Sequence, residues 1–145
     1  RLSPEIQGLG ISIDDSVELV KKMSKMEVDF IHLSCWNIYD HSSEYPKNSK
    51  PLTEWFTRSI VNLPPIISTG NIWSTKDAKN AMGQGADLIG VARVAVPYPD
   101  WAKNIVDSKY DPPRGPFTSQ QLRKAQLSDV FINYMRKWDG FVADK

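Results

Sequence analysis

The sequence predicts an α/β fold with parallel strands: the C-terminal portion, about strands 5–8, of a (β/α)8 TIM barrel, followed by a C-terminal helix. Strand-like and helix-like segments alternate along the chain, as is typical of parallel α/β proteins. The apolar run Pro65–Thr69 ends in Gly70 and Asn71, and a second run, Ala86–Ala92, ends in Arg93. In such barrels the loops after strands 7 and 8 often form a phosphate site.

The length of the chain indicates a partial barrel. A complete barrel of this type needs about 250 residues, and this chain has 145. It opens on Arg1–Ser3, which we interpret as the end of a strand. We therefore expect the C-terminal part of a longer enzyme, with residues 1–116 as the partial barrel and residues 117–145 as a helix packing on it. Open edges at strands 5 and 8 predict a homo-oligomer, or pairing with the other half of the barrel.

Composition excludes several classes of protein. The chain is 41% hydrophobic and 24% charged, and its net charge of +1 comes from interspersed charges. This balance argues against nucleic acid and membrane partners. The single cysteine, Cys35, cannot form an internal disulfide, and no metal site is expected. We expect a cytoplasmic location.

In the first half of the chain, Ser12 opens a capping-box pattern, and apolar residues at helical spacing predict a helix through about Glu27. The compact run Phe30–Ser34 predicts a strand. Thr53 is expected to cap a helix that reaches about Asn62. A strand before the long loop and a helix after it fit a βα repeat.

In the second half, Ser74 opens the same capping pattern before a helix that stops at Gly83. Prolines make residues 97–116 a mostly non-regular connector, with a helical turn near residues 101–106. The segment Ser119–Trp138 predicts one continuous helix. Its apolar stripe, which we expect to cover the barrel, consists of Leu127, Val130, Phe131, Tyr134 and Trp138.

The turns after the two apolar runs predict an anion pocket. Gly70 lets the backbone come close to a phosphate oxygen, and Arg93 offers a planar, permanently charged fork for the same oxygens. For His32, a hydrogen-bonded interior position is favoured over a catalytic one. Cys35 is interpreted as a small buried residue and not as a nucleophile, because no helix terminus or basic neighbour is evident to lower its pKa. His41 lies in a polar loop and is expected to be solvated.

The segment Cys35–Leu52 is long for a connection between a strand and a helix, and such loops are often lids or binding segments. It carries Trp36 and Tyr39 and is expected to emerge on the catalytic face, where these aromatic side chains would cover cofactor or substrate. The alternative is an ordered loop that packs its own aromatic side chains. Both interpretations stay open at this point.

Five landmarks occur in order: Arg1–Ser3, Val28–Ser34, Pro65–Asn71, Thr75–Ala78, and Gly85–Arg93 followed by Pro99–Trp101. Together they resemble the C-terminal half of the Old Yellow Enzyme family, the FMN-dependent NAD(P)H:flavin oxidoreductases and ene-reductases. In that family they correspond to the end of strand 5, strand 6, strand 7, the next helix, and strand 8 with its exit. The resemblance covers almost the whole chain.

The resemblance implies an FMN cofactor bound by Arg1, Gly70, Asn71, Ala92 and Arg93. Arg1 matches an arginine that lies against the flavin ring, where a cation stabilises the negative charge of reduced FMN. Gly70 and Asn71 match the phosphate loop after strand 7, and Ala92 and Arg93 match a Gly-Arg pair that holds the phosphate. The implied reaction is hydride transfer from NADH or NADPH to FMN, and then to an electron-poor alkene or a similar small-molecule acceptor.

Two departures and one absence qualify this resemblance. Ala92 replaces the usual glycine and adds a methyl group where the backbone approaches the phosphate closely. Tyr98 stands where the family commonly has asparagine, which predicts a different exit loop. The family's substrate-holding histidine pair (or His/Asn pair) and proton-donating tyrosine lie in the N-terminal half. No catalytic residue is therefore expected in this chain, and we expect it to be inactive alone.

Two other functions remain open. A phosphosugar isomerase or aldolase-type barrel uses the same phosphate site after strands 7 and 8 for different chemistry, although Arg1–Ser3 and Pro99–Trp101 argue against it. The third function is non-catalytic: a fragment that assembles with another chain.

Overall fold

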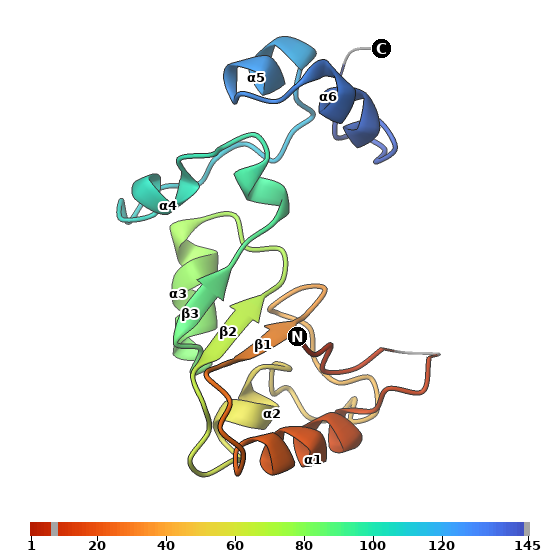
Figure 1. Ribbon diagram of the computed structural model, residues 1–145, viewed down its shortest axis with the longest axis vertical. Helices are drawn as coiled ribbons and strands as arrows, with labels where there is room; N and C mark the ends of the chain where they lie inside the picture. Colours follow the sequence, from red (N-terminus) through yellow and green to blue (C-terminus); the bar gives the residue numbers. More distant parts are fainter. Residues whose placement is uncertain (7–8, 144–145) are drawn as a thin grey trace. The chain divides into compact units, whose positions relative to one another are not determined.

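The computed structural model describes residues 1–6 and 9–143 (Figure 1). The chain forms two compact units, Arg1–Ile72 with Lys76–Val91, and Trp73–Thr75 with Ala92–Lys145. The predicted domain boundary at residue 116 stays a prediction. In chain order the elements are α1 (Ile13–Met23), β1 (Ile31–Ser34), α2 (Glu54–Thr57), β2 (Ile66–Thr69), α3 (Thr75–Gly83), β3 (Leu88–Gly90), the 3-10 helix η1 (Arg93–Ala95), α4 (Trp101–Asn104), α5 (Ser119–Lys124) and α6 (Asp129–Met135).

The first unit contains a parallel sheet in the strand order β1-β2-β3, and Figure 1 shows the three arrows running in the same direction. A further backbone segment pairs with β1 from the other side. The amide of Leu2 donates to the carbonyl of His32 and the amide of Ser34 donates to the carbonyl of Leu2, both across 2.8 Å. Four parallel segments are therefore neighbours in the order of the sequence. This arrangement confirms the α/β class and is compatible with part of a barrel.

One face of the sheet is covered by the core. In β1 and β2, buried residues alternate with half-buried ones, as the two-residue period of a strand requires. Helices α1 and α2 supply apolar side chains to the same cluster, and removing these surfaces from water is the main stabilisation of the unit. The buried members of this cluster are Ile13, Val20, Ile31, Leu33, Cys35, Leu52, Phe56, Ile66 and Ala86.

Helix α1 begins as its sequence predicts and ends earlier than expected. The Ser12 hydroxyl accepts a hydrogen bond from the amide of Asp15 across 3.0 Å and so caps the helix. The helix ends at Met23, with Ser24 as its C-cap, and does not continue to Glu27. The apolar periodicity beyond Met23 belongs to a turn, in which the amide of Met26 bonds to the carbonyl of Met23.

Helix α2 and strand β3 are also shorter than predicted. Arg58 is the C-cap of α2, and Asn62 adopts a left-handed backbone with φ 57°, so the helix does not reach Asn62. Strand β3 covers Leu88–Gly90 and not the whole run Ala86–Ala92, because its backbone pairs with β2 over those three residues. Apolar composition alone does not show where strand pairing stops.

The prediction of one continuous C-terminal helix is wrong. Helix α5 begins with a capping box in which the Thr118 hydroxyl accepts from the amide of Gln121, and it ends at Lys124. Gln126 then adopts a left-handed conformation with φ 67°, which an α-helix cannot contain. The Ser128 hydroxyl accepts from the amide of Phe131 and starts α6 as a second helix. Ser128 followed by Asp129 is an N-cap signal that the apolar periodicity obscured.

The break changes which face of the C-terminal segment is buried. In α6 the buried residues are Ile132 and Met135, and α5 contributes Leu122. Four of the five residues of the predicted stripe are exposed, and Leu127 is half-buried. The exposed four are Val130, Phe131, Tyr134 and Trp138. Among the described residues, no helix combines the length and apolar character needed to cross a bilayer.

Candidate functional site

The carboxyl ends of β2 and β3 lie side by side, because Thr69 pairs with Gly90. Gly70 therefore leaves the sheet at the same edge as the end of β3, where barrel enzymes place their sites. Arg93 follows Gly90 by three residues along the chain and opens η1. Since Gly70 and Arg93 belong to different compact units, a shared phosphate contact between them stays a prediction.

The turn after β2 is tightly packed against the loop after β1. The Ile38 amide donates to the Gly70 carbonyl across 3.1 Å. A Cβ added at Gly70 would lie 2.9 Å from the Cys35 carbonyl oxygen and 3.0 Å from the Ile38 amide nitrogen. Asn71 continues the turn with a left-handed backbone of φ 50°, which asparagine tolerates. The structure thus gives Gly70 a packing role that sequence reasoning did not identify.

The face of the sheet opposite the core carries both polar and apolar side chains, and we call it the open face. Leu2 pairs with Leu33 and packs against the core, so Arg1 lies on the same face as His32. The alternation of side chains along β1 and β2 predicts which residues lie on this face, but we applied it only to His32. The paired residues of the open face are His32, Ser34, Ile67, Thr69, Leu88 and Gly90, and Arg1 and Ser3 flank the paired Leu2.

His32 is hydrogen-bonded and half-buried, as predicted. Its Nε2 atom lies 2.7 Å from the Thr69 hydroxyl oxygen. Burial, together with the positive charges of the α-amino group and guanidinium of Arg1, lowers the pKa of His32.

The loop Cys35–Leu52 is an ordered loop with several anchors. The Tyr39 hydroxyl donates to the Asp77 carboxylate across 2.8 Å, which ties the loop to the first turn of α3. The buried Gln84 side-chain amide donates to the Ile38 carbonyl across 2.9 Å. Trp36, by contrast, is 84% exposed. Tyr39 is thus an anchor of the loop, and the role of Trp36 and Tyr39 as a cover over cofactor or substrate stays a prediction.

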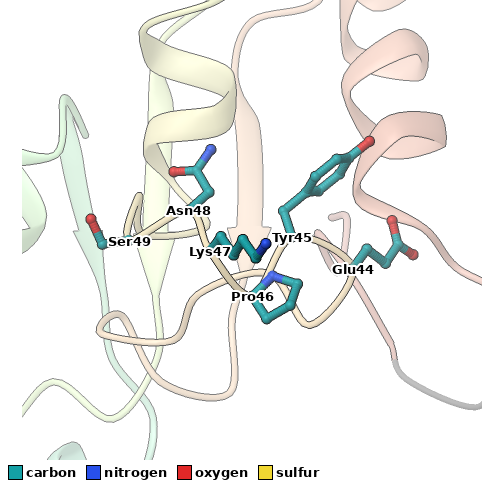
Figure 2. A pocket seen from close by; sticks show the side chains of 6 residues that line it. All are labelled: Glu44, Tyr45, Pro46, Lys47, Asn48 and Ser49. Atoms are coloured by element: carbon teal, nitrogen blue, oxygen red, sulfur yellow. The ribbon is translucent and has the colours of Figure 1, made fainter.

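Part of the same loop forms an open surface pocket of about 660 Å³, lined by Glu44, Tyr45, Pro46, Lys47, Asn48 and Ser49 (Figure 2). The Tyr45 hydroxyl donates to the Asp14 carboxylate on α1, and the Tyr45 ring packs in a tilted arrangement against Trp55, with 4.9 Å between the ring centroids. Lys50 lies 4.4 Å from the centre of the Trp55 ring. These contacts fix the shape of the loop. The pocket includes none of the predicted cofactor residues, so we assign it no role in the chemistry.

The predictions for the other two titratable candidates are confirmed. Cys35 is buried, and burial raises the pKa of its thiol to about 11. A thiol with this pKa is a poor nucleophile at neutral pH. His41 is exposed and lies outside the sheet. No group of three or more metal-ligating side chains occurs among the described residues.

In the second unit, Ala92 and Arg93 are both exposed, and Ala92 has a backbone that is neither extended nor helical, with φ −132° and ψ −77°, immediately before η1. The exit loop is organised around Tyr98. Its hydroxyl donates to the Pro113 carbonyl across 3.0 Å, and its ring packs edge-on against Phe117. Burial, with a smaller effect of Tyr110, raises the pKa of Tyr98. The tyrosine that departs from the family pattern therefore has a structural role in its own unit.

Comparison with known proteins identifies three related enzymes, whereas no family model matches the chain. The chain is 31% identical over 113 residues, 75% of its length, to the NADH:acrylate oxidoreductase of Vibrio harveyi. It is 31% identical over 110 residues to the NADH:fumarate oxidoreductase of Klebsiella pneumoniae (strain 342). It is 23% identical over 110 residues to the probable NADH-dependent flavin oxidoreductase YqiG of Bacillus subtilis (strain 168). The chain spans 11%, 12% and 30% of the length of these relatives.

Proposed function

Because the chain is related to NADH-dependent flavin oxidoreductases, as its resemblance to the Old Yellow Enzyme family predicts, we propose that it is the FMN-binding C-terminal part of such an enzyme. The reductant is NADH or NADPH, and the acceptor is a small electron-poor molecule. The observation that supports this proposal most directly is the order of the parallel segments. Leu2, β1, β2 and β3 are neighbours in sequence order, as strands 5–8 of the proposed barrel require.

In this proposal the FMN phosphate is held by Gly70 and Asn71 after β2 and by Ala92 and Arg93 after β3. The donor chemistry fits a phosphate: Arg93 is exposed and offers a charged fork, and backbone amides supply the remaining donors. Arg1 is exposed at the open face, where a cation suits the electron-rich edge of a flavin. When bound, FMN supplies the hydride-transfer chemistry.

The proposal assigns the reacting groups to another part of the enzyme. The open face offers hydroxyl groups, an imidazole and a guanidinium, and none of these matches the family's proton-donating tyrosine or substrate-holding pair. This chain would therefore bind and orient the cofactor, and a homo-oligomer or the other half of the barrel would complete the site. The methyl group of Ala92 is expected to weaken phosphate binding relative to glycine.

FMN retention tests the proposal. The protein is mixed with FMN and desalted, and its visible spectrum and flavin fluorescence are recorded. We expect retained FMN in the unchanged chain and at least about tenfold weaker binding in Arg93→Ala, because charge-assisted hydrogen bonds to a phosphate are lost. Arg123→Ala is the matched control, since Arg123 pairs with Asp129 on the surface of the same unit.

The other outcomes distinguish the remaining functions. Unchanged FMN affinity in Arg93→Ala would remove Arg93 from the site. Retention of a sugar phosphate without flavin would favour the isomerase or aldolase-type barrel. Retention of neither ligand would contradict the proposal and favour a non-catalytic fragment that assembles with another chain.

A further inference from the structure

The end of the loop after β2 belongs to the same compact unit as Arg93. Gly70 starts this loop in the first unit, whereas Trp73–Thr75 are part of the second unit, together with Arg93. All of Trp73–Thr75 is buried. The contacts that hold these residues within the second unit therefore also fix where the loop ends with respect to Arg93.

Trp101 holds the loop at Trp73. The Trp101 indole N–H donates to the Trp73 carbonyl across 2.7 Å, and both residues are buried. The backbone of Trp101 leads back to η1: its amide donates to the Tyr98 carbonyl across 3.0 Å, and the Tyr98 amide donates to the Val94 carbonyl across 3.2 Å. Val94 is buried and follows Arg93 in η1. A chain of hydrogen bonds within one unit thus connects the turn of Arg93 to the loop after β2.

Thr75, the first residue of α3, provides a second attachment in the same unit. Its amide donates to the Tyr110 carbonyl across 3.0 Å. Its hydroxyl donates to the Asp107 carbonyl across 2.6 Å and lies 3.1 Å from the Ile105 carbonyl oxygen. Because only 4% of Thr75 is exposed, water does not replace these bonds when they are lost. The end of the loop is therefore held at two points, Trp73 and Thr75.

We propose that Trp101 and Thr75 are positioning residues of the phosphate site: they hold the end of the loop after β2 in the unit that carries Arg93, so that backbone donors at this end and the Arg93 guanidinium bind one phosphate together. This inference rests on the proposed function. In this role neither side chain contacts the phosphate, and each acts through the backbone that it holds. Donors that are fixed before the ligand arrives lose less conformational entropy on binding, so they bind more tightly.

The first arm of the test measures the dissociation constant of FMN by quenching of flavin fluorescence. Trp101→Phe keeps an aromatic ring but cannot donate to Trp73, and Thr75→Val keeps the shape but has no hydroxyl. Each should weaken FMN binding about tenfold. Thr75→Ser keeps the hydroxyl and should bind as the unchanged chain does. Trp138→Phe is the control for Trp101→Phe, because Trp138 is exposed and packs against Tyr134 in the same unit.

The double variant Arg93→Ala/Trp101→Phe separates positioning from a general loss of structure. If Trp101 acts through the phosphate site, the two losses overlap, and the double variant binds FMN about as weakly as Arg93→Ala alone. Independent effects would multiply to about a hundredfold loss and would overturn the positioning role. Unchanged FMN affinity in Trp101→Phe or in Thr75→Val would remove that residue from the role.

The second arm needs no cofactor. Hydrogen exchange of the Thr75 amide, followed by NMR, should be at least about tenfold faster in Trp101→Phe, because the end of the loop opens more often. The Leu122 amide in α5 is the internal reference, since it lies in the same unit and bonds to the Thr118 carbonyl. Equal acceleration of both amides would indicate a general loss of stability and would overturn the positioning role. If Trp101→Phe does not fold, the same comparison in Thr75→Val decides.

The two proposals fail in different ways. FMN retained by the unchanged chain, with no weakening in Trp101→Phe and Thr75→Val, overturns the positioning role and leaves the proposed function intact. Absence of FMN retention by the unchanged chain overturns the proposed function and with it the positioning role, while the exchange of the Thr75 amide still shows whether Trp101 holds the loop.

Discussion

The Ile38 amide donates a hydrogen bond to the Gly70 carbonyl, across 3.1 Å, and joins the loop after β1 to the turn after β2. A second backbone bond, from the Cys35 amide to the Thr69 carbonyl across 2.8 Å, lies beside it. These contacts bring the two backbones so close that a side chain at position 70 has no room. Gly70 is therefore needed by the fold, whatever it contributes to phosphate binding.

Gly70→Ala should destabilise the first unit in the absence of FMN. The added methyl group would meet backbone atoms of Cys35 and Ile38, and overpacking of this kind costs about 2 kcal/mol of unfolding free energy. Urea unfolding followed by circular dichroism measures the change. Gly83→Ala is the matched control, because a Cβ there meets nothing within 4 Å. Equal stability of the two variants would contradict the packing role of Gly70.

Stability should fall at acidic pH through Glu5. Burial raises the pKa of this carboxyl group, but hydrogen bonds from Ser42 and Ser43 outweigh burial and lower it from the ordinary value of 4.5. Because the folded-state pKa is the lower one, the contribution to stability is complete above the unfolded-state pKa and disappears as pH falls through the folded-state pKa.

Glu5→Gln should remove this part of the pH dependence and cost about 1 kcal/mol at neutral pH, since the hydrogen bonds lose their charged acceptor. Urea unfolding between pH 7 and pH 3 measures both effects. Glu18→Gln is the control, because Glu18 pairs with Lys22 on the exposed side of α1. If the two variants show the same pH dependence, Glu5 is not an acid-sensitive anchor.

The Cys35 thiol should be nearly inert in the folded protein. With burial raising its pKa to about 11, its thiolate fraction at pH 8 is about a hundredfold below that of a free thiol. Labelling with a disulfide reagent such as DTNB can be followed by absorbance. It should be slow in buffer and rapid in about 6 M guanidinium chloride, which unfolds most domains. Rapid labelling of the native chain would show that Cys35 is accessible.

The break between α5 and α6 predicts opposite effects for two substitutions. Gln126→Gly should raise the unfolding free energy of the second unit by up to about 1 kcal/mol, because glycine adopts φ 67° without strain. Ser128→Ala should lower it by about 1 kcal/mol through loss of the N-cap. Thermal unfolding measures both. In a continuous helix Gln126→Gly would be destabilising, so the sign of its effect decides between the two structures.

Local signals in the sequence predicted the elements better than their ends. The hydroxyl of Ser12 and the apolar run around Leu33 act within a few residues, so helix α1 and strand β1 were found where expected. The end of β3 at Gly90 depends on pairing with β2, a contact between distant parts of the chain. The prediction of a single C-terminal helix was wrong for a related reason. The spacing of Val130 and Phe131 was interpreted as the buried face of one helix, although the N-cap at Ser128 separates two helices.

The residues of the candidate site also divide into those with a local signal in the sequence and those whose role depends on distant contacts. Gly70 and Arg93 were proposed as an anion pocket because they follow the apolar runs that predict two neighbouring strands, and Asn71 was added from the family resemblance; their contact with a phosphate stays a prediction. Thr69 was not identified, since its importance comes from a hydrogen bond to His32, 37 residues away, and from the space left by Gly90.

By itself, the sequence determined the α/β class and the polar turns at the strand ends, because these depend on short-range periodicity and on side-chain chemistry. The relationship to flavin oxidoreductases was predicted from the resemblance of five landmarks to the Old Yellow Enzyme family. Only the folded chain decided that Gly70 is confined by the Cys35–Ile38 backbone, that Tyr39 anchors a loop to Asp77, and that His32 shares a face with Arg1. Each of these depends on which strand lies next to which, and strand neighbours are chosen by burial over the whole unit and not by any local sequence.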